Sequence, residues 1–422
     1  FTINPNGANT YTIQGGNAVV SPSSNVNYTV IGTSTAGCLS QAFATSSLIV
    51  NPNPNITLNT STICAGNSLT LNSISPASGG IITYSNGYTI HTFTSSSAFI
   101  APSNLNLEYL VVGGGGSGGI NTAGNGGGGG AGGFLTGIIN NLPASNYSIT
   151  VGNGGSVGNN GGNSSFHTYT AIGGGKGGWY NGSSNGTPGT AGGSGGGGGQ
   201  HISFGGAGTP GQGNAGGNAV GPGGLGAAGG GGAGAIGNNS YGPNQASGGY
   251  GGAGLISSIT GNTVYYAGGG GGSSHNSSPV LSLGGIGGGG NGHYGGTTAT
   301  NGQPNTGGGG GGGGEGYQPG VGGSGIVIIK YQTVSIASYT WSTGANTSSI
   351  SISPTLTSNY SVAVTSTAGC NGASNTATVN VNPLPVISIS GSSAICVGQT
   401  ATLIANGANT YTWSNASTAS SI

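Results

Sequence analysis

The feature that most constrains this chain is a glycine-rich block at residues 113–325, which holds 88 of the 103 glycines. Glycine-rich sequence is usually a flexible linker. This block, however, is interrupted by apolar or aromatic segments, several of which alternate with the period of two that is typical of half-buried strands. These segments are 134–139, 147–151, 165–172, 255–259 and 263–267.

Glycine has no Cβ, so polyproline II helices made of it can pack almost backbone to backbone. In such a bundle each N–H and C=O group can point to a neighbouring helix. Ordering the backbone costs about 1–2 kcal/mol per residue, so the bundle needs strands to hold it. We therefore expect an ordered bundle on a strand framework that includes 108–112 and 325–331. The alternative is a disordered spacer.

Charged side chains are almost absent from the sequence. The acidic residues are Glu108 and Glu315, and the basic ones are Lys176 and Lys330, whereas an average soluble domain has about 25% charged residues. Nucleic-acid binding needs a basic face, calcium-stapled repeats need clustered carboxylates, and glycoside hydrolysis needs paired acids. We expect no enzyme activity, no cofactor, no nucleic-acid partner and, without a run of 18 apolar residues, no membrane span.

The sequence on both sides of the block consists of copies of one module. The motif Thr-Ser-Thr-Ala-Gly-Cys ends at Cys38 and again at Cys370, and the hexapeptide Gly-Ala-Asn-Thr-Tyr-Thr occurs at 7–12 and at 407–412. Repetition of this kind marks a structural unit. One copy contains about seven short alternating strands, which is the pattern of a β-sandwich.

The middle copy of the module is interrupted. Cys396 and Tyr411 are 15 positions apart in the last copy, whereas their counterparts Cys64 and Tyr339 are 275 apart. The spacing predicts that the glycine-rich region is inserted into a loop of the middle sandwich, and that the sequence starts and stops within modules of a longer protein. The predicted domains are a truncated module at 1–54, an interrupted module at 55–78 and 335–385, the glycine-rich domain at 79–334 and a truncated module at 386–422.

Each module contains two cysteines near opposite ends of its sequence. We expect Cys64 and Cys370 to form a disulfide that closes the middle module, and Cys38 and Cys396 to pair with cysteines outside the chain. Bridges between neighbouring modules, or free thiols, are the alternatives. A disulfide would stabilise a small module by about 2–4 kcal/mol and would indicate an oxidising, extracellular location.

Several motifs resemble known families. The flanking modules, with Ile-Cys-x-Gly, Tyr-Thr-Trp-Ser-x-Gly and Ala-Gly-Cys, resemble the Ig-like repeats of giant surface adhesins of Bacteroidota, including SprB-type gliding-motility adhesins exported by type IX secretion. The insertion resembles a bacterial and phage glycine-rich domain at 87–93, 108–112, 129–134, 148–152 and 322–329. The resemblance implies an all-β fold of tandem Ig-like β-sandwich modules with an inserted glycine-rich domain, located at the cell surface.

Aromatic and histidine side chains in turn-rich segments are the candidates for surface contact, because rings on exposed loops suit binding to sugars or surfaces. The alternative is that they cap the ends of the bundle. Trp341 and Trp413, at the repeated Tyr-Thr-Trp position, are expected in sandwich cores, and no histidine spacing predicts a metal site. The candidates are Trp179, Tyr180, His201, Phe204, Tyr241, His275, His293, Tyr294 and Tyr317.

We therefore expect a segment of an extracellular adhesin or filament. In this hypothesis the Ig-like modules form a stalk, and the glycine-rich domain contacts a surface polysaccharide, a substratum or another cell, with possible lateral or head-to-tail self-association. The alternatives are a purely structural fibre and an ice-binding or phage-type receptor-binding module.

Overall fold

A computed structural model describes the whole chain except residues 1, 9, 14–15, 17–18, 23–25, 43, 49, 52, 55, 57, 73–76, 103, 121–123, 181, 183–184, 221–223, 242–245 and 279. The described residues form strands and extended segments without a helix, so the expected all-β class is confirmed. The chain divides into two compact units. One is Ser75–Thr333, and the other combines Phe1–Ile74 with Val334–Ile422.

The strand framework of the glycine-rich unit consists of two main sheets and a hairpin. A five-stranded sheet has the order β10-β9-β16-β7-β6, a four-stranded sheet has the order β13-β12-β11-β8, and β14 pairs with β15. All these pairings are antiparallel. The strands are β6 (Ile81–Ser85), β7 (Tyr88–Phe93), β8 (Ser97–Ala101), β9 (Leu105–Val112), β10 (Phe134–Leu142), β11 (Ser145–Thr150), β12 (Ser164–Phe166), β13 (Tyr169–Ala171), β14 (Leu255–Ser257), β15 (Val264–Tyr266) and β16 (Ile326–Gln332).

The central strands β9 and β16 are buried on both faces, which explains their nearly continuous apolar sequences. Tyr109 and Val111 of β9 pack in one hydrophobic cluster with residues of the four-stranded sheet. Leu110 and Val112 point to the opposite face and pack in a second cluster with Tyr266 of β15. Because these two strands lead into and out of the glycine block, they anchor its first and last segments.

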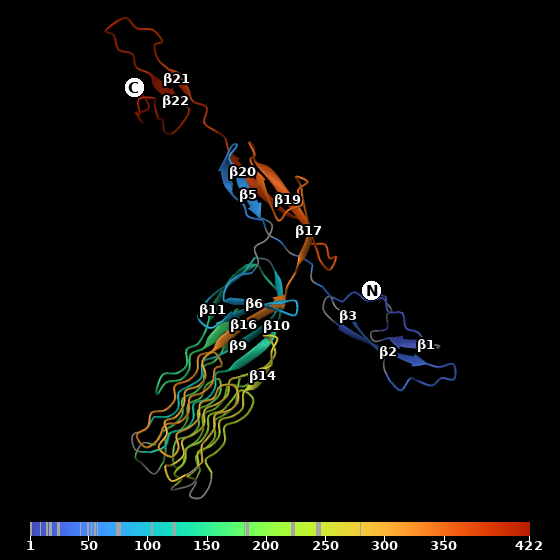
Figure 1. Cartoon of the computed structure of the whole chain (residues 1–422), viewed down its shortest axis with the longest axis vertical. Helices are drawn as coiled ribbons and strands as arrows, with labels where there is room; N and C mark the ends of the chain where they lie inside the picture. The colour runs from blue at the N-terminus through green and yellow to red at the C-terminus, as the bar shows by residue number, and fades with distance from the viewer. Residues whose placement is uncertain are drawn as a thin grey trace. The chain divides into compact units, whose positions relative to one another are not determined.

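The glycine segments are joined by hydrogen bonds that repeat every third residue. Gly113, Gly116 and Gly119 donate to carbonyls of the returning segment at Gly133, Gly130 and Gly127. The residues between them donate elsewhere: Gly114 and Ser117 to Gly162 and Asn159, and Gly115 and Gly118 to Gly323 and Gly320. Three consecutive residues thus face three different neighbours, as expected for a helix with three residues per turn. The expected polyproline II bundle is present (Figure 1).

Segment 126–133 lies at the centre of the bundle and is hydrogen-bonded to six neighbouring segments. It donates to three of them, through pairs such as Gly126 to Gly313, Gly127 to Gly178 and Gly128 to Ala228. It accepts from three others, through pairs such as Gly119 to Gly127, Gly197 to Gly128 and Gly270 to Gly129. Such packing leaves no space for a side chain at most of these positions, and the exception, Ala131, carries only a methyl group. A Cβ added to Gly128 would lie 2.0 Å from the carbonyl oxygen of Gly270.

At the periphery of the bundle, asparagine side chains accept hydrogen bonds from backbone N–H groups that have no neighbouring helix to bond to. The Oδ1 atom of Asn218, for example, accepts from the backbone N–H of Gly205 at 2.9 Å. An unpaired backbone donor is costly when water cannot reach it, so the amide oxygen completes the hydrogen bonding where no further helix is present. The same pattern occurs at Asn160, Asn163, Asn239, Asn291 and Asn301.

The second unit contains the sandwich modules. Its sheets have the orders β1-β2-β3, β17-β19-β20-β4, β18-β5 and β21-β22. Strands β4 and β5 precede the glycine-rich unit and pair with β20 and β18, which follow it, so the glycine-rich unit is inserted within one sandwich. The expected core position is confirmed for Trp341 but not for Trp413, which is only half-buried and belongs to no hydrophobic cluster among the described residues. The strands are β1 (Thr10–Ile13), β2 (Val26–Thr33), β3 (Ala44–Leu48), β4 (Thr62–Cys64), β5 (Leu69–Asn72), β17 (Ile336–Trp341), β18 (Ser349–Ile352), β19 (Ser358–Ser366), β20 (Asn375–Asn382), β21 (Ser388–Ser390) and β22 (Ile404–Asn406).

The expected Cys64–Cys370 disulfide is absent, and the register of β20 explains why. Cys64 pairs with Asn382 at the end of β20, whereas Cys370 precedes the first residue of that strand. An eight-residue strand is about 25 Å long at 3.3 Å per residue, whereas a disulfide requires Cα atoms within about 7 Å. All four cysteines, including Cys38 and Cys396, are free thiols in the structure.

Substituting Gly128 by alanine tests the close packing of the bundle. We expect the free energy of unfolding to fall by about 3 kcal/mol, because the new methyl group would overlap backbone atoms that cannot rotate away. Gly162→Ala is the matched control, because its nearest contact would be 3.1 Å, at the backbone nitrogen of Asn153. Denaturant unfolding followed by circular dichroism measures both variants, and equal losses would contradict the packing.

A second prediction concerns the buried His91. Its Nδ1 atom lies 2.7 Å from the carbonyl oxygen of Gly79 and must donate, so Nε2 of the neutral ring accepts from the Tyr331 hydroxyl at 3.1 Å. Burial lowers the pKa of His91 below its ordinary value of 6.5, against the opposing effect of the bond to Gly79. The unfolded chain therefore binds the proton more readily, and this contribution to stability is lost as the pH falls below 6.5.

His91→Gln isolates that contribution. We expect this variant to be less stable than the wild type at neutral pH but to lose less stability between about pH 6.5 and pH 5, because the titrating ring is gone. Thermal unfolding over that pH range measures the slopes. Identical slopes for the two proteins would exclude His91 as the source of the acid sensitivity.

Candidate site at the distal end of the glycine bundle

The chain runs back and forth along the bundle, and its turns away from the sheets converge at one end. Residues 113–119 leave β9 and residues 126–133 return to β10, so Gly119 and Gly127, which are hydrogen-bonded, lie at the end remote from both strands (Figure 1). Other turns at this end are joined to residues 124–125 by backbone hydrogen bonds, from Gln200 to Asn125 and from Glu315 to Gly124. We call these turns the distal turns.

All nine candidate residues lie in or beside the distal turns. Further backbone hydrogen bonds join one turn to another: His201 donates to Gly224, His275 to Ala246, and Ser274 to His293. The topology therefore brings together residues that are more than a hundred positions apart in sequence, such as Asn125 and Ser273, whose side chains are hydrogen-bonded.

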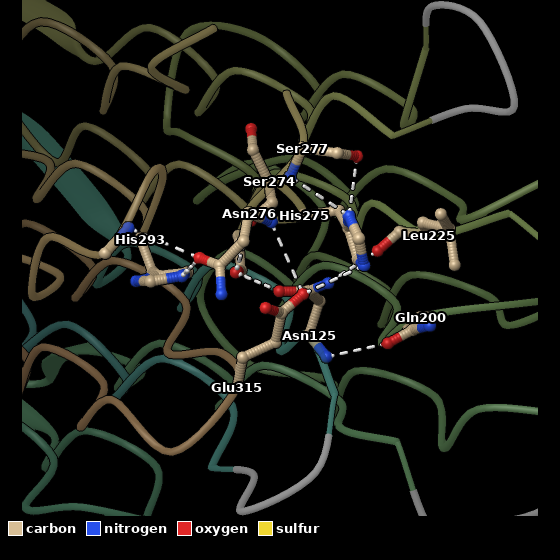
Figure 2. Close-up of polar contacts among 11 residues, drawn as sticks. Asn125, Gln200, Leu225, Ser274, His275, Asn276, Ser277, His293 and Glu315 are labelled. Atoms are coloured by element: carbon tan, nitrogen blue, oxygen red, sulfur yellow. Dashed lines mark hydrogen bonds and ion pairs between the residues drawn. The ribbon is translucent and has the colours of Figure 1, made fainter. Parts of the chain in front are cut away.

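A buried polar cluster organises the distal turns, with Asn125 at its centre (Figure 2). The backbone N–H of Asn125 donates to Gln200 Oε1 at 2.8 Å, and its Nδ2 atom donates to the Leu225 carbonyl at 2.6 Å. Its Oδ1 atom accepts from Ser273 Oγ at 2.6 Å. One fully buried residue thus links three other turns, one through its backbone N–H and two through its side chain, so the distal turns are held as a preorganised surface.

His293 belongs to this interior, and its predicted role in surface contact is wrong. The ring is fully buried, stacks on Tyr317 at a centroid distance of 4.6 Å, and bonds through Nε2 to Asn276 Oδ1 at 3.0 Å. Its Nδ1 atom bonds to the carbonyl of Thr297. The ring lies against the glycine backbone, since a Cβ added to Gly314 would be 3.1 Å from His293 Cδ2.

The other candidates are at least partly accessible, and several contact a neighbouring turn. Tyr180 packs on His201 with ring centroids 5.0 Å apart, and the Tyr241 hydroxyl donates to the Tyr250 hydroxyl at 3.0 Å. Burial, followed by that hydrogen bond, raises the pKa of Tyr241 to about 12. Phe204 is the most exposed, with 68% of its surface accessible. Trp179, His275, Tyr294 and Tyr317 are half-buried.

The charged groups at this end are paired as well. His275 Nε2 lies 3.2 Å from Glu315 Oε1, and the same carboxylate oxygen accepts from the backbone N–H of Asn276 at 3.3 Å. The Lys176 ammonium lies over the Trp179 ring at 5.2 Å. Glu315 and His201 adopt positive φ angles of 51° and 67°, a conformation that is uncommon for residues other than glycine and often occurs at functional positions.

The sequence interpretation did not identify the polar cluster. Asn125 comes directly before a run of five glycines, and Gln200 directly follows another run. The available signal was therefore a polar residue directly beside a glycine run.

Among the described residues no three histidine, cysteine or acidic side chains group as metal ligands. The residues that the structure describes also contain no helix that is long and apolar enough to cross a bilayer.

Comparison with known families agrees with this architecture. The model of the glycine-rich domain family matches residues 92–332, which are more than half of the chain. The chain belongs to the glycine-rich domain family. The match begins in β7 and ends with the last residue of β16, so this domain comprises the bundle with most of its strand framework. No curated protein matches the chain.

Replacing Asn125 by alanine tests the polar cluster of the glycine-rich domain. We expect a loss of about 3 kcal/mol in unfolding free energy, because the Leu225 carbonyl and the buried Ser273 hydroxyl, on two different turns, each lose a hydrogen bond. The control is Gln318→Ala, a polar truncation on an exposed distal turn, which should change stability by less than about 0.5 kcal/mol. If Asn125→Ala leaves the free energy of unfolding unchanged, the turns are ordered without this side chain.

Proposed function

We propose that this chain is part of an extracellular adhesin whose glycine-rich domain contacts neutral polysaccharides or similar surfaces through its distal turns. The sandwich modules form the stalk in this proposal, and the protein acts by binding rather than by catalysis. The observation that carries the proposal is the convergence of the aromatic distal turns at one end of a tightly bonded bundle.

The physical properties of the distal turns support this kind of ligand. Aromatic rings such as Phe204 offer flat apolar faces, and neighbouring amide and hydroxyl groups can hydrogen-bond to sugar hydroxyls. The net formal charge of the chain is zero, so a strongly charged ligand has little to recognise. Binding through uncharged groups also changes little with salt concentration, which suits a protein exposed to a variable medium.

The rigidity of the bundle supports binding by a preorganised surface. Each internal glycine segment is hydrogen-bonded to neighbours along its length, so the distal turns do not have to be ordered when a ligand binds, and less entropy is lost. The resemblance of the flanking modules to those of SprB-type adhesins supports a role at the surface of a gliding bacterium, with export by type IX secretion.

Adhesion to immobilised dextran and cellulose, with anionic alginate as the comparison, tests the proposal. We expect the wild-type chain to be retained on a neutral polysaccharide with little dependence on salt. Phe204→Ser should weaken retention about tenfold, equivalent to about 1.4 kcal/mol. The matched control is Tyr84→Ser on β6, because Tyr84 is similarly exposed at 72% but lies on the strand framework. Equal losses for both variants would contradict binding by the distal turns.

A further inference from the structure

A second group of aromatic side chains lies on the strand framework of the glycine-rich domain, outside the distal turns. Ring centroids are 5.7 Å apart for Tyr147 and His167, and 6.3 Å apart for His167 and Tyr169. Tyr169 in turn stacks on Tyr109 at 4.3 Å. His167 is exposed, Tyr147 and Tyr169 are half-buried, and Tyr109 is buried. These four residues, which we call the framework rings, connect the interior of the domain to its surface.

The framework rings are held in place by the hydrophobic core beneath them. The ring of the fully buried Phe166 lies 6.1 Å from that of Tyr147 and 6.4 Å from that of Tyr109. It also lies 6.5 Å from the imidazole of His167. The Tyr147 hydroxyl donates to the carbonyl oxygen of Pro143 at 2.7 Å. The accessible ring faces are therefore preorganised, and little entropy is lost when a ligand covers them.

The backbone conformation of His167 supports a binding role for its ring. His167 and Thr168 form the two-residue turn between β12 and β13, and His167 has a φ of 54°. Tight hairpin turns favour glycine, asparagine or aspartate at positive φ, and other residues in that conformation often occur at functional positions. The Nδ1 atom of His167 bonds to the Thr168 hydroxyl at 3.2 Å, whereas its Nε2 atom has no hydrogen-bond partner among the described residues. The imidazole is thus available to a ligand.

The four charged residues of the chain lie away from the framework rings. Glu108 precedes Tyr109 on β9, so it points to the opposite face of the sheet, where its carboxylate is paired with Lys330 at 2.9 Å. Lys176 and Glu315 contact residues of the distal turns. A ligand of the framework rings is therefore expected to be uncharged.

We propose that the framework rings form a second carbohydrate site, which binds an uncharged oligosaccharide across the exposed His167 and the half-buried Tyr147 and Tyr169. The apolar faces of sugar units can pack on the aromatic rings. Their hydroxyl groups can bond to His167 Nε2 and to the exposed Thr168, which supply the few polar contacts that fix a ligand's orientation. Three accessible rings in succession offer neighbouring sugar units separate faces on which to pack.

This site is separate from the distal turns and does not rest on binding by them. Residues 172–179 lead from β13 to Trp179 and bond to the same neighbour at every third residue, as Gly174 and Gly177 do to the segment 113–119. At 3.1 Å per residue this stretch of polyproline II is about 22 Å long. Because the two sites lie at opposite ends of the bundle, a long polysaccharide can contact both, and its avidity should exceed that of a short oligosaccharide.

NMR titration of the isotopically labelled chain with cellohexaose, and in parallel with isomaltohexaose, tests the proposal. We expect one of these uncharged oligosaccharides to shift the imidazole signals of His167, independently of those of His275, which report on the distal turns. Tyr169→Ser should weaken the binding measured at His167 about tenfold, because a stacking face is lost. Tyr169→Phe keeps the ring on Tyr109 and should weaken it by less than about threefold.

Tyr265→Ser is the matched control, because Tyr265 is an exposed tyrosine on the β14–β15 hairpin of the same framework. It should leave the titration at His167 unchanged. His167→Asn, followed at the ring signals of Tyr169, is an independent variant, because the side chain is exposed and asparagine tolerates positive φ. This variant should weaken binding about fivefold without loss of the fold.

Signals of His167 that move with neither oligosaccharide overturn the proposal. Equal losses of affinity for Tyr169→Ser and Tyr265→Ser overturn it as well, as does unchanged affinity in His167→Asn. Shifts confined to His275 would leave the distal turns as the carbohydrate site and contradict the framework rings alone. Shifts confined to His167 would support the framework rings and contradict the distal turns.

Discussion

The structure of the glycine-rich domain depends on the hydrogen bond between the backbone N–H of one polyproline II segment and a carbonyl of the next. Each residue in the centre of the bundle faces a different neighbour from the residue before it, so segment 126–133 is bonded on six sides. Bonds of this kind require backbones to approach within a distance that excludes Cβ atoms, as at Gly128. The abundance of glycine is therefore a packing requirement, although each ordered glycine carries a large entropic cost.

The two ends of the domain compensate for that cost in different ways. At one end, β9 and β16 bury apolar side chains on both faces and fix where the first and last glycine segments begin. At the other end, where the helices stop, side chains such as Asn125 and His293 hydrogen-bond one turn to another. The interior between the two ends consists mostly of backbone, so the chemical variety of the domain is concentrated in its turns and on its periphery.

Local sequence patterns predicted which segments form strands better than they predicted which segments bond to one another. The apolar segments beside the glycine block became β9 and β16, and the repeat spacing indicated the inserted domain. Gly113 bonds to Gly133 but Gly115 bonds to Gly323, and no local signal in a glycine run specifies such partners. The turn residues were recognisable, but the burial of His293 was not, because it depends on Tyr317 and Asn276 in other turns. Likewise, the spacing assigned Cys64 and Cys370 to one module without revealing that β20 separates them.

Hydrogen exchange of individual glycine amides, measured by NMR on the isotopically labelled chain, tests the central claim most directly. Backbone amides in stable elements exchange only when the structure opens. The account predicts that the amides of residues 126–133 exchange as slowly as those of β9 and β16, although they belong to no sheet. Amides of the exposed distal turns should exchange much faster. Exchange of residues 126–133 at the rate of an unstructured peptide would contradict the bundle and would indicate a flexible glycine spacer.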